Sequence, residues 1–262
     1  WTRFDWFADY QIYTFSPLWF GYIGVVNALT FKRTGGSMLT HRPKYLAMLF
    51  IASAVFWWYF EFLNRFVQNW YYTGIDGITP TQYAILATLP FATVLPAVLA
   101  TYELLETFPR LSAGMDSYKP IQVPKPKMTA VIVLAVAATG LLAIGIFPDY
   151  LYPLLWLSPL FIFTAIERIT GVETIFATLS TGNWRRIYLL GLSALICGFF
   201  WEMWNIYSHA KWIYSIPFVD TMHIFEMPLL GYAGYLPFGL ECAVIADLCE
   251  KIFLSEKTKK SL

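Results

Sequence analysis

Residues 56–72 read FWWYFEFLNRFVQNWYY, and residues 199–214 read FFWEMWNIYSHAKWIY. A shift of 141 positions aligns an acid, an amide and a third polar residue: Glu61, Asn64 and Gln68 align with Glu202, Asn205 and His209. A shift of 142 then aligns two Trp-x-Tyr pairs: Trp70 and Tyr72 align with Trp212 and Tyr214. The spacing i, i+3, i+7 puts each polar trio on one arc of a helix. The two stretches therefore predict two similar halves, each with a polar helix face followed by an aromatic pair.

The composition indicates an integral membrane protein. Of the 262 residues, 58% are hydrophobic and only 13% are charged, whereas about a quarter of the residues in a soluble domain are charged. The net charge is +1 and the basic residues form no stripe, so nucleic acid is not a predicted partner. The three cysteines, Cys197, Cys242 and Cys249, have no metal-binding spacing and lie in apolar stretches, which predicts packing roles.

Seven apolar stretches approach the ~20 residues that cross a bilayer. They lie at about 13–31, 45–69, 82–107, 128–147, 150–167, 187–209 and 224–250. Gly, Pro, Asn and Asp residues separate several of them, as expected of loops. The opening residues are aromatic and of mixed charge, which is typical of a segment at the membrane–water interface.

The placement of charges predicts an orientation. The loops after the first, third, fifth and seventh stretches hold all of the 18 Lys and Arg residues except Arg3, Arg65 and Lys211. Basic loops face the cytoplasm in most membrane proteins. The N-terminus is therefore predicted outside and the C-terminus in the cytoplasm, with the protein in the inner (cytoplasmic) membrane of a prokaryote.

A proline-rich basic linker predicts the division into repeats. The predicted segments are an interfacial segment 1–12, a three-helix repeat A at 13–108, the linker 109–127, a connecting helix 128–147, a three-helix repeat B at 148–254 and a basic tail 255–262. An odd helix between the repeats makes both triplets run in the same direction. The predicted fold is an all-α membrane protein of seven helices in a 3+1+3 arrangement.

Acids within the predicted membrane helices are the first candidates for function. Glu61 and Glu202 fall in the outer third of the second and sixth stretches, where an unpaired carboxylate is costly and by default marks a functional site. Such an acid can act as a proton donor. For Glu61 the alternative is an i,i+4 ion pair with Arg65. Glu202 has Ile206 at that position and no basic partner there.

Further polar residues lie near the same predicted surface. Glu226 precedes Pro228, and Glu241 lies deeper in the seventh stretch. His and carboxylate side chains can ligate metals, but the His-x-x-Glu spacing of His223 and Glu226 is weakly specific, and repeat A has Gln68 in place of the aligned histidine. No metal site and no cofactor is predicted, apart from a bound carotenoid or lipid.

Aromatic residues surround the two acids in the sequence. An aromatic face attracts a cationic centre by about 0.5–2 kcal/mol, so an acid with an aromatic cage suits the protonation of an alkene to a carbocation. The alternative is an interfacial belt of Trp and Tyr. The candidate binding residues are Trp58, Trp70, Tyr72, Trp201, Trp204, Trp212 and Tyr214, with Asn64, Asn205, His209 and Glu241.

The run Trp201-Glu202, then Trp212-Ile213-Tyr214, then Phe225-Glu226-Met227-Pro228 resembles the membrane lycopene-cyclase domain family. This resemblance implies tandem three-helix domains and acid-initiated chemistry on a carotenoid. Family members follow the proline with two adjacent acids, where this chain has Leu229 and Leu230.

Three functions remain open at this stage. The first is binding, with or without modification, of an isoprenoid or carotenoid-like lipid, with Glu202, Glu61 and Glu226 as the catalytic candidates and Asn64 and Asn205 orienting the acids. The second is a non-catalytic pigment- or lipid-binding subunit with membrane-protein partners. The third is a small-solute transporter, because 3+1+3 repeats also build carriers and Pro90, Pro96, Pro228 and Pro237 could break helices.

Overall fold

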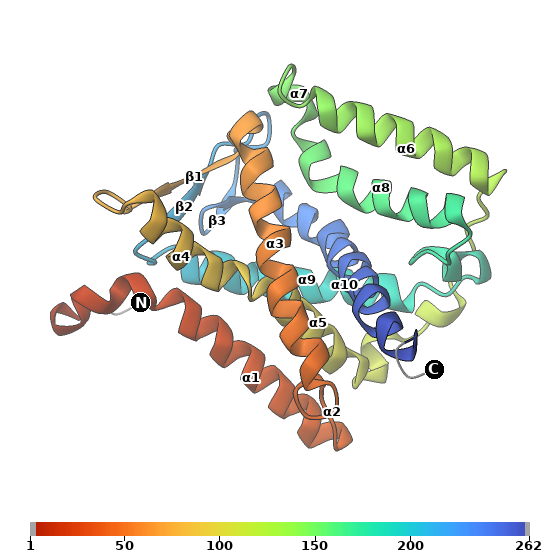
Figure 1. The fold of residues 1–262 in the computed structure, drawn as a ribbon, viewed down its shortest axis with the longest axis horizontal. Coiled ribbons are helices and arrows are strands. Elements are labelled where there is room, and N and C mark those ends of the chain that lie inside the picture. Colours follow the sequence, from red (N-terminus) through yellow and green to blue (C-terminus); the bar gives the residue numbers. More distant parts are fainter. Residues whose placement is uncertain (1–3, 260–262) are drawn as a thin grey trace.

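The computed structural model describes residues 4–259 as a mostly helical protein (Figure 1). Residues 1–3 and 260–262, at the ends of the predicted interfacial segment and basic tail, lie outside the described residues. In chain order the elements are η1 (Asp5–Tyr13), α1 (Phe15–Thr34), α2 (Met38–His41), α3 (Pro43–Val67), β1 (Trp70–Thr73), α4 (Pro80–Phe91), α5 (Val94–Glu106), η2 (Pro109–Ser112), η3 (Met115–Ser117), α6 (Pro126–Ala143), α7 (Pro148–Leu151), α8 (Pro153–Thr170), η4 (Ala177–Thr181), α9 (Arg185–Asn205), β2 (Lys211–Tyr214), β3 (His223–Ile224), β4 (Met227–Pro228), η5 (Leu229–Gly234) and α10 (Tyr235–Lys259).

The long apolar helices fit an integral membrane protein. Six segments of residues 4–259 are long and apolar enough to cross a membrane: α3, α4 with α5, α6, α8, α9, and η5 with α10. The first predicted stretch is also helical, as the 20-residue α1, but α1 is not among these six. Helix α6 lies at the edge of the molecule (Figure 1), and only 11% of its 18 residues are buried.

Helix ends are set by local chemistry. Pro43, Pro80 and Pro153 stand in the first turns of their helices, where a missing N–H group costs nothing. Gly35 after α1 and Gly171 after α8 both have left-handed backbone, with φ of 80° and 82°. Glycine allows this conformation without strain and caps the helix. Both glycines follow a threonine, so α1 and α8 end alike.

The segment predicted as one stretch at 82–107 is broken near its middle. Helix α4 ends at Phe91 and α5 begins at Val94, just after Pro90. Ser53 of α3 satisfies the backbone at the break, because its Oγ donates to the Phe91 carbonyl (2.6 Å) and accepts from the Leu95 N–H group (3.1 Å). The seventh stretch has a matching discontinuity, since the 3₁₀ segment η5 gives way to α10 at Tyr235, which a shift of 141 aligns with Val94.

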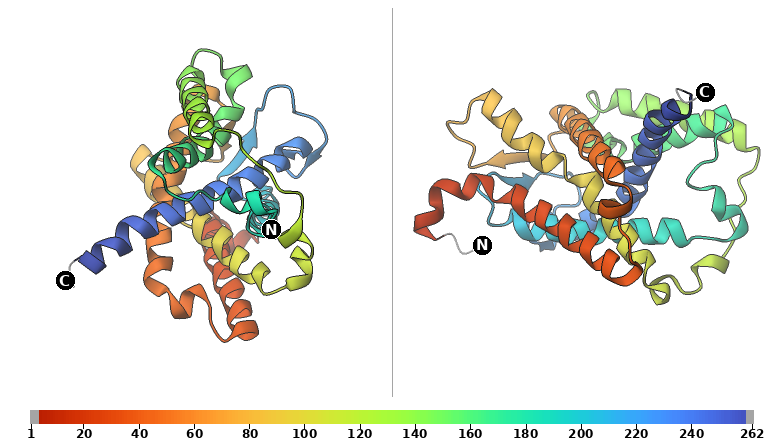
Figure 2. Two further views of the ribbon diagram at one scale, coloured as in Figure 1. Left: turned by 90° about the vertical axis from the view of Figure 1, so that its right-hand side faces the viewer. Right: turned by 60° about the horizontal axis from the view of Figure 1, so that its bottom comes forward.

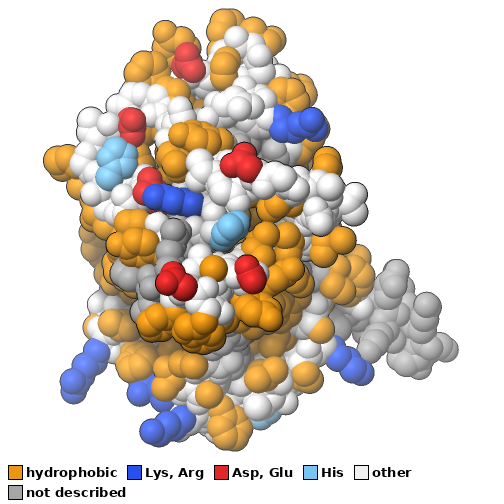
Figure 3. All heavy atoms as spheres, turned by 90° about the vertical axis from the view of Figure 1, so that its left-hand side faces the viewer, with side chains coloured by type: hydrophobic (Ala, Val, Ile, Leu, Met, Phe, Trp, Pro, Cys, Tyr) orange, Lys and Arg blue, Asp and Glu red, His pale blue; other side chains and the backbone are white. Residues whose placement is uncertain are grey.

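Helix ends that carry basic residues meet at one end of the molecule. Arg42 pairs with Glu250 (2.5 Å), and the other pairs are Arg186 with Asp247 (2.7 Å) and Lys251 with Glu167 (3.1 Å). All are partly exposed, so each contributes about 0–1 kcal/mol. The N-terminus lies toward the opposite end (Figures 1 and 2). The face on that side mixes acids, bases and histidines among hydrophobic side chains, with Lys and Arg along its lower margin (Figure 3).

Candidate functional site

Two strands that follow the duplicated helices pair with each other. β1, after α3, and β2, after α9, form an antiparallel ribbon in which Tyr71 lies opposite Ile213 (Figure 1). On either side of this pair, Trp70 lies opposite Tyr214 and Tyr72 opposite Trp212. Because a shift of 142 maps each strand onto the other, the register is symmetric about the Tyr71–Ile213 pair. The pairing of β1 with β2 is therefore locally two-fold symmetric.

Two buried asparagines fasten the ribbon to its helices. The Asn64 side chain donates to the Trp70 carbonyl (2.7 Å), and its Oδ1 accepts from the Asn69 N–H group (2.8 Å). The Asn205 side chain donates to the Trp212 carbonyl (2.7 Å) and accepts from the Trp212 N–H group (2.9 Å). We expected these amides to orient the acids. Instead they bond to the backbone, so they position the strands whose side chains contact the acids.

Glu61 is held by its own half of the ribbon. The Tyr72 hydroxyl donates to Glu61 Oε1 (2.6 Å), and the Trp70 indole N–H group donates to the same oxygen (3.1 Å). The alternative ion pair with Arg65 does not form, and the Arg65 side chain is exposed. The strand thus supplies both described hydrogen-bond donors of this acid.

Glu202 has a different set of partners. The hydroxyls of Tyr214 (2.7 Å) and Tyr235 (2.8 Å) both donate to its Oε1, and the Trp212 indole N–H group donates to the Tyr214 hydroxyl (3.0 Å). Its Oε2 is buried without a partner, and the residue is 0% exposed. Gly198, one turn earlier on α9, leaves room for the Tyr235 ring, since a Cβ atom there would clash with it.

Two tyrosines of the ribbon, Tyr72 and Tyr214, keep their protons. Burial, together with the nearby charge of Glu61, raises the pKa of Tyr72 well above its usual range. Burial and the charge of Glu202 do the same to the pKa of Tyr214. Both phenols are therefore donors at neutral pH, and each places an O–H group against a carboxyl oxygen.

A cavity of about 430 Å³ lies under the ribbon. It is lined by both Trp-x-Tyr pairs, by residues at the helix breaks and by further aromatic rings. Those at the breaks are Pro90, Phe91, Val94, Gly234 and Tyr235. Neither Glu61 nor Glu202 lines it. Each acid stands behind the tyrosine hydroxyls that do, so any proton passing from an acid to a molecule in the cavity must travel through a phenol.

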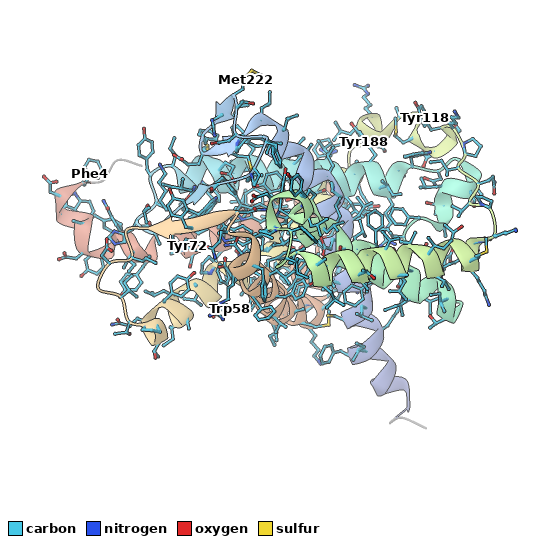
Figure 4. The ribbon with its side chains drawn as sticks, turned by 90° about the horizontal axis from the view of Figure 1, so that it is seen from above. Phe4, Trp58, Tyr72, Tyr118, Tyr188 and Met222 are labelled. Atoms are coloured by element: carbon cyan, nitrogen blue, oxygen red, sulfur yellow. The ribbon has the colours of Figure 1, made fainter. Side chains whose placement is uncertain are left out.

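The predicted aromatic residues divide between the cavity and the surrounding core. Trp201 lines the cavity and stacks on Tyr235 (ring centroids 5.9 Å apart). Trp204 packs on Trp19 instead (4.9 Å) and does not line it. Trp58 donates to Thr88 Oγ1 (2.9 Å) and lines a second pocket beside α4, which shares Ile75, Ile78 and Tyr83 with the cavity. Figure 4 labels Trp58 and Tyr72.

The remaining candidates lie apart from one another. Glu226 forms an ion pair with Lys211 of β2, with both side chains about three-quarters buried. His209 is exposed and lines the cavity. Glu241 is fully buried on α10 and does not line the cavity. Within residues 4–259, no three His, Cys, Asp or Glu side chains are grouped so that they could hold a metal ion.

Sequence reasoning missed Tyr235, which donates the second phenol to Glu202. The repeat did not mark it, because its aligned residue in repeat A is Val94. The available signal was a tyrosine in an apolar stretch, two residues before Pro237.

Comparisons with protein-family models, with curated proteins and with solved structures found no match to this chain.

Proposed function

We propose that this protein binds an isoprenoid or carotenoid-like lipid in the cavity under the ribbon and modifies it by acid-initiated chemistry. The observation that carries the proposal is the cavity itself, whose wall holds the Trp-x-Tyr pairs of both halves, with a carboxyl group hydrogen-bonded behind each pair. Aromatic walls suit a long unsaturated chain, and they stabilise a positive charge on it.

The proposed architecture is the 3+1+3 duplication in the inner membrane of a prokaryote, with the N-terminus outside. The symmetric register of β1 and β2, the matching helix breaks at Val94 and Tyr235, and the shared Thr-Gly helix ends support the duplication. In this arrangement α1 is the first of seven membrane helices, and α6 connects the two triplets. The ion-paired basic end is then cytoplasmic.

In the proposed reaction, Glu202 supplies the proton through Tyr235 or Tyr214. The phenol O–H group turns from Glu202 Oε1 toward the alkene and adds its proton to one carbon, and the carboxyl proton of Glu202 then passes to the phenol oxygen. The resulting carbocation closes a carbon–carbon bond or shifts its double bond. A neighbouring carbon then gives a proton to the phenol oxygen while the phenol returns its own proton to the carboxylate, which restores the enzyme, so the product is an isomer of the substrate.

A non-catalytic lipid-binding subunit is the second candidate. It is favoured by the position of both glutamates behind the cavity wall and by Leu229 and Leu230, which stand where the resembling family has adjacent acids. A transporter is the third candidate, favoured by helix breaks at aligned positions that border the cavity.

The test is to purify the protein in mild detergent, extract what it carries, and identify it by mass spectrometry and absorption spectroscopy. A long polyene or isoprenoid supports the proposal. Incubation of that molecule with wild-type protein and with Glu202→Gln then separates catalysis from binding, because only the wild type should yield an isomer of unchanged mass. Retention of the molecule without conversion by either protein would favour the non-catalytic subunit.

A further inference from the structure

Glu241 is the buried group that the site described above does not use. It lies on α10 within a membrane-crossing segment and is 0% exposed. Both of its carboxyl oxygens lack hydrogen-bond partners, and none of the ion pairs among residues 4–259 involves it. A carboxyl group in such surroundings is costly. Its presence therefore calls for a role other than stability.

The duplication makes the same point. A shift of 141 aligns Glu241 with Ala100 of α5, which is also 0% exposed. Repeat A thus fills the matching position with a methyl group and packs it fully. The helix packing of this fold does not require an acid here, so the carboxyl group is a specific feature of repeat B.

Glu241 lies one helical turn beyond the cavity-lining part of α10. Phe238, one helical turn earlier on α10, lines the cavity and is itself only 3% exposed. Its ring contacts Phe56 (6.0 Å between centroids), Phe60 (6.1 Å) and Trp201 (6.3 Å). We call Phe238 and these neighbouring rings the aromatic floor. Phe238 is the last residue of α10 that lines the cavity, and Glu241 follows it at i+3, on the same side of the helix.

The surroundings of Glu241 suit the smallest cation. Glu241 lines neither the cavity nor the pocket beside Trp58, and no set of metal ligands surrounds it within the described residues. Its ionisable neighbours there are Tyr59 of α3 and Cys242 of α10, and α5, α8, α9 and η5 place no charged group close enough to act on it. A proton needs neither an open space nor several ligands.

We propose that Glu241 is a proton-binding site, and that displacement of Phe238 connects it to the cavity. With the proton bound, the carboxyl group is neutral and tolerates its dry surroundings. Release of the proton leaves an unpaired charge, which is relieved only when α10 moves and water reaches the group. Because α10 also carries Tyr235, the same movement alters the contact with Glu202. The proposal does not depend on which molecule fills the cavity.

Infrared spectroscopy of the ligand-free protein in lipid nanodiscs tests the bound proton. The wild type should show a carboxylic-acid C=O band at neutral pH that is lost in Glu241→Gln and kept in the control Glu250→Gln, whose acid is partly exposed. The proposal would be overturned if the difference between the wild-type and Glu241→Gln spectra contained carboxylate bands and no carboxylic-acid band.

Hydrogen–deuterium exchange tests the connection to the cavity. In D₂O the Glu241 band should shift slowly in the wild type and about tenfold faster in Phe238→Ala, because opening of the aromatic floor limits access. Phe66→Ala, which removes an exposed ring from α3, is the matched control and should exchange at the wild-type rate. Equal rates in all three proteins would show that Phe238 does not separate Glu241 from the cavity. All of these readouts are taken without ligand, so they can fail while the proposed function stands.

Discussion

The two glutamates occupy aligned positions but lie in unlike surroundings. Glu61 is half-buried and takes its donors from one strand, an indole and a phenol. Glu202 is fully buried, takes two phenols from different elements and keeps one oxygen unpartnered. The asparagine that fastens each strand is the same in both halves. The two strands are thus fastened alike while the two acids differ in their surroundings, and for this reason the proposed reaction takes its proton from Glu202.

The largest expected effect is the difference in activity between the Glu202 and Glu61 variants. Glu202→Gln should lower conversion of the bound lipid by about 10²–10⁴-fold, the usual contribution of a general acid. Glu61→Gln should lower it far less, since that carboxyl lies in the half without the second phenol. Product formed per amount of folded protein is the measurement. An equal loss in the two variants would make the acids equivalent and remove the distinction.

The next effect concerns Asn64 and Asn205, whose replacement should destabilise the protein by equal amounts. Asn64→Ala and Asn205→Ala each leave buried backbone groups of the ribbon without a partner, so each should lower the free energy of unfolding by about 1–3 kcal/mol. Thermal unfolding in detergent measures the loss, with Gln68→Ala as the control because its side chain is exposed. A clear inequality between the two asparagine variants would contradict the symmetry of the ribbon.

A smaller effect is expected from the second phenol. Tyr235→Phe removes one donor from Glu202 and leaves Tyr214 in place, so the free energy of unfolding should fall by about 1 kcal/mol. Conversion should fall further than stability if the proton passes through this hydroxyl. Tyr83→Phe is a fair comparison, because Tyr83 also lines the cavity yet donates no described hydrogen bond to a carboxyl group.

Alkaline pH should weaken both halves together. The pKa of Tyr72 and of Tyr214 is raised in the folded protein, so their stabilising effect is complete below the unfolded value of about 10 and is lost as the pH rises above it. The melting temperature should therefore fall above about pH 10, and less steeply in Tyr72→Phe or Tyr214→Phe. If the melting temperature of both variants fell with pH as steeply as that of the wild type, other titrating groups would be responsible for the fall.

The smallest effect concerns Arg65. Since this side chain is exposed and makes no ion pair with Glu61, Arg65→Gln should change the free energy of unfolding by less than about 0.5 kcal/mol. Chemical or thermal unfolding measures it. A larger loss of stability would indicate that Arg65 forms an ion pair with Glu61 and that Glu61 has a structural role.

The helices followed from the sequence because hydropathy and chain punctuation are local properties. Each predicted apolar stretch contains a helix, and Pro90 was among the residues predicted to break a helix, as it does before Val94. The ribbon was not predicted, because Trp70 and Tyr72 read equally well as interfacial residues and strand pairing joins residues far apart in the chain. The role of the asparagines was misjudged for a related reason, since the backbone they bond lies beyond the helix on which they were placed.

The register of the ribbon has an evolutionary consequence. Two identical strands that cross antiparallel at one common residue make an isologous contact, the kind found in a symmetric dimer. Here the crossing joins Tyr71 to Ile213, its own counterpart. Under the proposed duplication, a single three-helix ancestor that assembled in pairs would have closed the same ribbon between separate chains, and fusion through α6 would then have allowed each copy to specialise.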